Sequence, residues 1–179
     1  MTRPEAASSA SSLPVRIAAR TGEAIYAIVV LLLTSVGVGA AARRGILIPV
    51  AVPFAAVLVV ALRLLRPPAE RAAWALFTVW LGTTYLQTGA TSETVMALLY
   101  LAAALAGVFV SPWLLVAAWA AHPLWDLLPR TLPALLSDLP TACLFFDLAI
   151  AAYLAWVTAR GQWSLLTAHS TNTAAHQPE

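Results

Sequence analysis

The sequence predicts an all-α fold, a polytopic membrane helix bundle with about six transmembrane helices. Hydrophobic residues make up 61% of the 179-residue chain and charged residues only 10%, whereas a soluble domain has about 45–50% and about 25%. The mean hydropathy is +0.83, and the apolar residues gather in six stretches that are each long enough to cross a bilayer as a helix. This composition excludes a soluble enzyme, a disordered chain and a disulfide scaffold.

Residues 1–23 precede the first apolar stretch, and we expect them to form a disordered or interfacial N-terminal segment. Residues 1–12 are rich in Ser, Ala and Thr without a hydrophobic period, and residues 13–20 could form a short helix at the membrane surface. Arg16 and Arg20 precede an apolar run that has no close cleavage site. We therefore expect an uncleaved first helix and not a signal peptide.

The expected transmembrane bundle occupies residues 24–161, and a polar tail follows at 162–179. Its apolar stretches are residues 24–41, 46–65, 72–90, 94–110, 112–129 and 141–160. As helices they would be about 26–30 Å long, close to the thickness of the hydrocarbon core. Pro, Gly and Arg separate the stretches. The fourth and fifth nearly touch in sequence, so five helices, one of them long and broken, are the alternative.

The arginines predict the orientation of the chain in the membrane. With six spans, seven arginines lie on the side of the N-terminus and three on the other, which favours a multi-pass protein of the cell membrane with both termini in the cytoplasm. Because the arginines sit in short loops and not on one basic face, we expect the lipid bilayer as a partner and no nucleic acid. Oligomerisation stays possible.

Ionisable residues inside the apolar stretches are the main functional signal, because each costs about 2.5–3.5 kcal/mol near the membrane centre. His122 and Asp126 are four residues apart and share one helix face near the end of the fifth stretch, and Asp147 lies near the start of the sixth. Because successive spans alternate in direction, these three and Glu93 should meet in one leaflet half. The sequence therefore predicts a polar pocket in the extracytoplasmic half, with little besides border arginines in the other.

Two kinds of chemistry fit this pocket. A divalent metal held by His122, Asp126 and Asp147 could activate water against a lipid ester or amide, with Glu93 as the base. Alternatively, an acid kept protonated by apolar surroundings could donate a proton to an isoprenoid-like or sterol-like substrate. Residues expected to bind the substrate are polar or aromatic: Thr84, Gln87, Trp80, Tyr85, Trp119 and Trp125.

Each candidate also has a structural interpretation. Glu93 could simply favour a helix start, Asp126 could pair with Arg130, and His122 could be a hydrogen-bonded packing residue. Cys143 is expected to be a small apolar filler. Asp147 is the hardest to explain structurally, because it lies deeper and has no basic neighbour one turn away.

The segment His122-Pro-Leu-Trp-Asp126, followed by Cys143-Leu-Phe-Phe-Asp147, resembles the C-terminal part of small uncharacterised bacterial multi-pass membrane proteins. Those proteins carry a His-x-x-Trp-Asp-x-x-His pattern and then a Cys/Phe-Asp helix. Pro129 and Arg130 stand where that pattern would place a histidine. The resemblance implies a shared site without naming its chemistry.

These observations leave three functions open. The first is a membrane-embedded enzyme that acts on a lipid or isoprenoid-like molecule by metal-assisted or acid/base chemistry. The second is an accessory subunit of a larger membrane complex, which needs no chemistry. The third is a proton-coupled transporter, which would need polar groups on both sides of the bundle to complete a path.

Overall fold

The protein is all-α, as the composition predicts, and the computed structural model describes residues 12–128 and 132–163. Within these residues it has six α-helices and two short 3₁₀-helices. They are α1 (Ser12–Arg43), α2 (Leu47–Arg63), α3 (Pro67–Gly82), η1 (Leu86–Thr88), α4 (Thr91–Phe109), α5 (Trp113–Asp126), η2 (Ala134–Leu136) and α6 (Leu139–Ala159).

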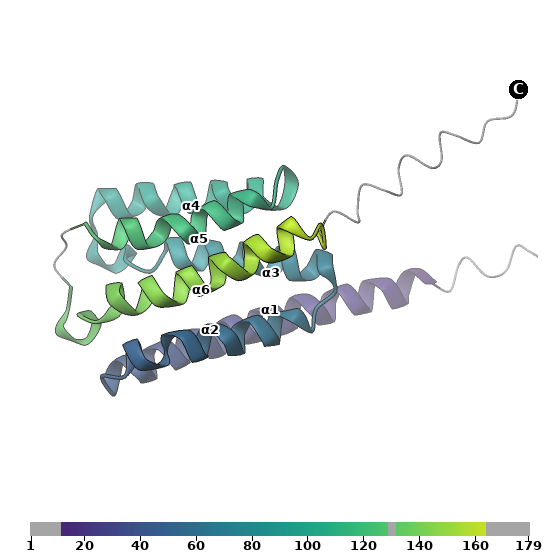
Figure 1. Cartoon of the computed structure of the whole chain (residues 1–179). Helices are drawn as coiled ribbons and strands as arrows, with labels where there is room; N and C mark the ends of the chain where they lie inside the picture. The colour runs from purple at the N-terminus through teal and green to yellow at the C-terminus, as the bar shows by residue number, and fades with distance from the viewer. Residues whose placement is uncertain (1–11, 129–131, 164–179) are drawn as a thin grey trace, which may run out of the picture.

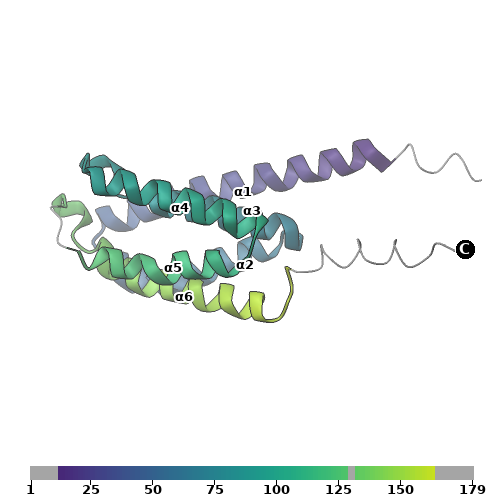
Figure 2. The ribbon, with the colours of Figure 1, turned by 90° about the horizontal axis from the view of Figure 1, so that it is seen from above.

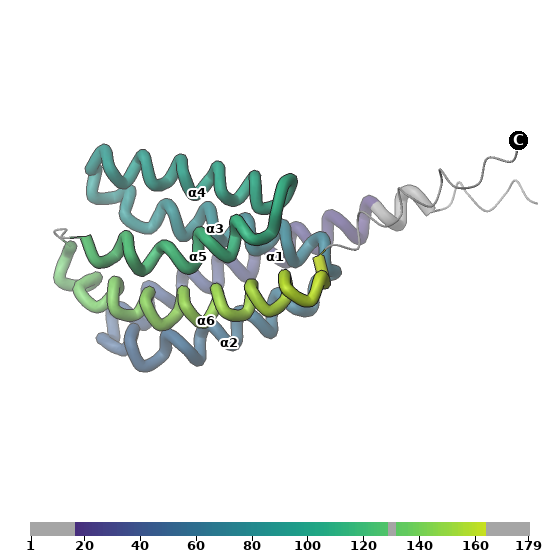
Figure 3. The backbone as a smooth tube through the Cα atoms, turned by 45° about the horizontal axis from the view of Figure 1, so that its top comes forward, coloured from purple at the N-terminus to yellow at the C-terminus, as the bar shows by residue number. Residues whose placement is uncertain are grey.

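The six helices run side by side and alternate in direction (Figures 1 and 2). The turns after α1, α3 and α5 lie at one end of the bundle, here called the turn end. The links after α2 and α4, the start of α1 and the end of α6 lie at the other, here called the terminal end (Figure 3). Helix α6 packs between α2 and α5, and α3 packs against α4 and α1. Helix α1, about 48 Å long, extends beyond its neighbours at the terminal end.

Three helical segments of the described chain are long and apolar enough to cross a membrane: Ile17–Arg43, Thr91–Phe109 and Ala134–Ala159. Helix α2 is a shorter apolar helix, and α3 and α5 have 16 and 14 residues, fewer than the roughly 20 of a typical span. The expected six helices are therefore present, and three of them have the length and apolarity of a span.

Helices α4 and α5 are separate and pack against each other, so the alternative of one long broken helix is wrong. Gly107 marks their close approach: a Cβ added there would lie 2.5 Å from Leu115 Cδ2. Small residues allow two helix backbones to approach in this way.

The N-terminal segment differs from the expectation. Residues 13–20 do not form a separate surface helix, because α1 is continuous from Ser12 to Arg43. The expected boundary between residues 23 and 24 thus falls inside one helix, and residues 1–11 lie outside the described residues. Toward the C-terminus Trp163 is buried, so the start of the expected tail at 162 belongs to the fold. Residues 164–179 lie outside the described residues.

Helix α3 also starts and ends earlier than its apolar stretch. Pro67 and Pro68 form its first turn, where a missing N–H costs nothing. At the other end the hydroxyls of Thr83 and Thr84 bond to the carbonyls of Trp80 and Leu81, both at 2.7 Å. Such side-chain bonds compete with the helical pattern, and the chain turns through η1 to Gly89.

An aromatic layer, made of Trp74, Phe77 and Trp119, fills the middle of the bundle, and all three side chains are fully buried. The Trp74 and Trp119 rings meet edge to face with centroids 5.9 Å apart. Trp119 Nε1 donates to Thr78 Oγ1 at 3.0 Å. This layer separates the polar groups at the two ends of the bundle.

Candidate metal centre and a second polar cluster

Four side chains that could bind a metal converge at the turn end of the bundle: His122 and Asp126 from α5, and Cys143 and Asp147 from α6. We call them the His/Asp/Cys cluster. One potential ligand atom from each residue lies within 4.8 Å of all the others, and all four residues are buried. His122 Nδ1 is 2.8 Å from Asp147 Oδ2 and 3.4 Å from Asp126 Oδ2.

Helix geometry explains this convergence. His122 and Asp126 are four residues apart, as are Cys143 and Asp147, so each pair projects from one face of its helix. Helices α5 and α6 pack against each other and run in opposite directions (Figure 2). The last turns of α5 therefore face the first turns of α6, and the two pairs meet.

Two tyrosines hold the imidazole of His122. The Tyr85 ring is stacked on it, with centroids 6.3 Å apart and planes inclined by 2°, and the Tyr100 ring meets it edge-on at 5.6 Å. The Tyr100 hydroxyl donates to the carbonyl of Ala118 at 3.0 Å. Gly82 makes this position of Tyr100 possible, because a Cβ there would lie only 2.4 Å from Tyr100 Cβ.

Asp147 carries the clearest sign of a missing partner. Its side chain is fully buried, and its Oδ1 atom accepts no hydrogen bond from any described residue. A buried carboxylate oxygen without a partner is costly, and such groups commonly bind a cation or a proton. A nitrogen, a thiolate and two carboxylates form a ligand set that suits Zn²⁺. The cluster could therefore hold a metal ion.

An apolar cavity of about 100 Å³ reaches this cluster from between α1, α2, α3 and α6. Asp147 and Cys143 form part of its wall, and most of the remaining lining is aliphatic or aromatic, including Phe54 and Phe146. Trp80 and Thr84, both expected to bind the substrate, also line it. The cavity thus leads from apolar surroundings to two members of the cluster.

The other residues singled out in the sequence have different positions. Glu93 is buried in the first turn of α4 and accepts a hydrogen bond from Trp125 Nε1 at 3.1 Å; it is not one of the four converging residues. Trp119 belongs to the aromatic layer. Gln87 is exposed in η1 and does not line the cavity. The suggested pairing of Asp126 with Arg130 lies outside the described residues.

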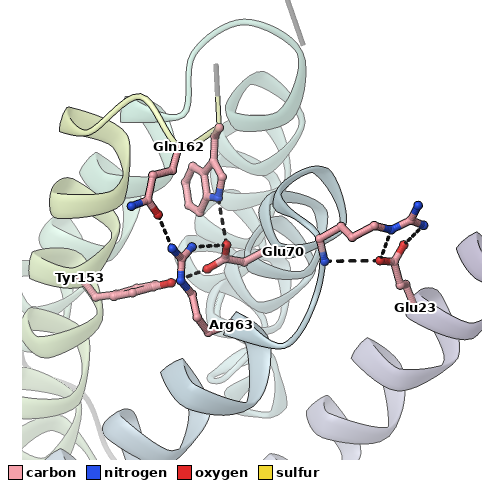
Figure 4. A network of polar contacts seen from close by, with 7 residues as sticks. Glu23, Arg63, Glu70, Tyr153 and Gln162 are labelled. Atoms are coloured by element: carbon pink, nitrogen blue, oxygen red, sulfur yellow. Dashed lines mark hydrogen bonds and ion pairs between the residues drawn. The ribbon is translucent and has the colours of Figure 1, made fainter. Parts of the chain in front are cut away.

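A second polar cluster, not predicted from the sequence, lies at the terminal end and is centred on Glu70 of α3 (Figure 4). The Glu70 side chain is fully buried. Its Oε2 accepts from Arg63 Nη1 at 2.9 Å and from Trp163 Nε1 at 3.2 Å, and its Oε1 accepts from the Tyr153 hydroxyl. Arg63 also donates to Gln162. The expectation that this end carries little besides border arginines is therefore wrong.

The class of protein is thus defined by the fold and by the site. It is an all-α protein with helices of membrane-spanning length and a buried group that could hold a metal. Residues 45–162, about two thirds of the chain, match a family model described as a family of unknown function (DUF6010), and the chain belongs to that family. No curated protein and no solved structure gives a significant match.

Proposed function

We propose that this protein is a multi-pass membrane enzyme that uses a divalent metal, Zn²⁺ by its ligand chemistry, to hydrolyse an ester or amide of a hydrophobic molecule. The observation that carries this proposal is the His/Asp/Cys cluster at the wall of an apolar cavity. An apolar substrate would lie in the cavity with its polar group toward Asp147 and Cys143. A lipid fits this arrangement because it combines an apolar chain with a polar group at one end.

The proposed roles differ from the sequence-based expectation in two respects, the third metal ligand and the base. We assign the metal to His122, Asp126 and Cys143, because catalytic zinc sites have three protein ligands and keep one position open for water. Asp147 is then the base, since its Oδ1 has no partner among the described residues and the residue lines the cavity. We do not assign the base to Glu93, because the Trp125 indole already donates to its carboxylate.

The reaction follows from these roles. The metal held by His122, Asp126 and Cys143 would supply Lewis-acid activation of water and of the carbonyl group. Asp147 would accept a proton from the attacking water, whose oxygen would bond to the carbonyl carbon of the substrate. The carbon–oxygen bond to the alcohol then breaks, and the departing oxygen takes the proton back from Asp147. From an ester the products are thus a carboxylic acid and an alcohol. From an amide the carbon–nitrogen bond would break instead, and the departing nitrogen would take the proton and leave as an amine. In both cases only water is consumed.

Metal content and hydrolysis, measured on the same purified variants, test this proposal. We expect about one equivalent of zinc per chain in the parent and less than about a tenth in Cys143→Ser. Asp147→Asn should keep the metal but lose hydrolysis of long-chain acyl esters. Asp138→Asn, which changes an exposed aspartate at the same end of the bundle, is the matched control and should behave as the parent.

The outcomes separate the alternatives. A parent without metal whose hydrolysis or proton transfer is lost in Asp147→Asn would replace the metal mechanism with acid/base chemistry. If the parent contained no metal and substitutions in the His/Asp/Cys cluster left its function unchanged, an accessory role in a membrane complex would be favoured. Proton-coupled transport is less well supported, because the aromatic layer of Trp74, Phe77 and Trp119 lies between the two polar ends.

We also propose that both termini lie in the cytoplasm and that the His/Asp/Cys cluster lies toward the opposite side of the membrane. The excess of arginines on the side of the N-terminus supports this orientation. Fusions of a periplasm-active reporter at the turn after α1 and at the C-terminus test it. Activity at the turn alone is expected, and activity at the C-terminus alone would reverse the orientation.

A further inference from the structure

A second cavity, of about 500 Å³, opens between α1 and α3 near the terminal end of the bundle, and we call it the α1/α3 groove. Its size is within the range of roughly 300–1,000 Å³ that is typical of small-molecule sites. Five of its eleven lining residues are alanines: Ala24, Ala27, Ala69, Ala72 and Ala73. None of the His/Asp/Cys cluster contributes to it, so it is separate from the proposed active site.

Three charged side chains line the groove together with these alanines: Arg20, Glu23 and Arg66. Glu23 is already neutralised, because its two carboxylate oxygens accept from Nε and Nη2 of Arg66, both at 2.6 Å (Figure 4). This bidentate contact raises the pKa of Arg66. Arg20 also acts electrostatically on Glu23, but it makes no hydrogen bond and no ion pair within 4.0 Å with another described residue. Beside the Glu23–Arg66 pair, the groove thus offers a second guanidinium whose donors bond to no other residue that the structure describes.

We propose that the α1/α3 groove binds one anionic phospholipid, with an acyl chain along the alanines and the phosphate on Arg20. Most residues that line the groove are apolar and can contact an acyl chain, whereas its three charged residues can contact a headgroup. A phospholipid has the same two parts. A guanidinium donates two parallel hydrogen bonds to a phosphate. The membrane orientation proposed above would place the groove in the cytoplasmic leaflet, which contains anionic lipids. Only the choice of leaflet rests on that orientation.

Native mass spectrometry of the full chain in detergent, with defined lipids added, tests this inference. We expect one phosphatidylglycerol to be retained per chain at concentrations where phosphatidylcholine is not. Arg20→Gln should reduce that occupancy about tenfold, the effect of losing about 1.4 kcal/mol. Ala72→Phe, which fills the groove from an exposed position, should reduce it similarly. Arg44→Gln and Ala102→Phe change exposed residues elsewhere and should have no effect.

Three results would overturn the inference. Equal retention of phosphatidylcholine would show that the headgroup is not recognised, and displacement of phosphatidylglycerol by inorganic phosphate would show an anion site without a role for the acyl chain. Parent-like retention in both Arg20→Gln and Ala72→Phe would place the lipid elsewhere. None of these variants changes a residue of the His/Asp/Cys cluster, so the zinc content should be unchanged in all of them. A failure of the lipid-binding inference would therefore not contradict the proposed hydrolase, which the zinc and hydrolysis measurements test separately.

Discussion

Removal of the Glu70 carboxylate should destabilise the bundle more than any other single loss of charge at its terminal end. Glu70 of α3 joins α2 through Arg63, α6 through Tyr153 and the C-terminal turn through Trp163. In Glu70→Ala the Tyr153 hydroxyl and the Trp163 indole lose their acceptor inside the protein, and Arg63 loses its counter-ion. Glu70→Gln, by contrast, keeps one acceptor oxygen and offers an amide to Tyr153.

The size of the effect follows from these contacts. Hydrogen bonds to a charged group contribute about 1.5–3 kcal/mol each, but such contributions do not add. The side chain of Arg63 is 39% exposed, so water replaces part of what the arginine loses and its share must be reduced. We therefore expect Glu70→Ala to lower the free energy of unfolding by about 3–5 kcal/mol. Glu70→Gln should lower it by about 1–2 kcal/mol.

Equilibrium unfolding in detergent micelles, followed by circular dichroism, measures these differences. Glu23→Gln provides the matched control, because it weakens the solvent-exposed pair with Arg66 and should leave the free energy of unfolding close to that of the parent. If Glu70→Ala unfolded within 1 kcal/mol of the parent, or if the glutamine variant were as unstable as the alanine variant, the reasoning from buried contacts would be refuted.

Three further predictions concern the turn end and the aromatic layer. Gly82→Val should displace Tyr100 and so lower both the free energy of unfolding and the affinity for zinc. Competition with a chelator measures this affinity, and an unchanged value would show that the Tyr100 ring does not support the site. Trp119→Phe, which removes the bond to Thr78, should cost about 1–3 kcal/mol in the same unfolding assay, whereas Trp113→Phe at an exposed position should cost much less. Zinc affinity should fall steadily from about pH 8 to about pH 5, because imidazole, thiolate and carboxylate ligands bind metal only when deprotonated; an affinity independent of pH would contradict this ligand set.

The sequence predicted the number and order of the helices well, because hydrophobic stretches and Gly/Pro breakers determine both. It misplaced the start of α3, since a search for apolar residues excludes a segment that contains Glu70 and Arg71. The pair Pro67–Pro68 followed by an acidic residue is itself a helix-start signal and could have corrected the boundary.

Part of the candidate site was also predictable. The spacing of His122 and Asp126, combined with alternating helix directions, predicts that Asp147 lies nearby, and the structure brings the three together. The sequence did not predict that Cys143 joins them. The position of the thiol depends on how α5 and α6 are aligned along their axes. Side-chain packing between the two helices determines this alignment, and no local sequence pattern records it.

The Glu70 cluster could not be predicted from local sequence. Its partners Tyr153 and Trp163 are 83 and 93 residues away along the chain. Tyrosine and tryptophan near helix ends are also typical of the membrane interface, so neither residue suggested a buried acid. Only the packing of α6 and the C-terminal turn against α2 and α3 identifies the cluster.

Zinc K-edge X-ray absorption on the zinc-loaded protein tests the central claim most directly, because it reports the atoms bound to the metal. The account predicts one sulfur at about 2.3 Å and nitrogen and oxygen ligands at about 2.0–2.2 Å, with an imidazole contribution that is lost in His122→Gln and a sulfur shell that is lost in Cys143→Ser. A shell of oxygen atoms alone, unchanged in both variants, would contradict a metal centre built from the His/Asp/Cys cluster.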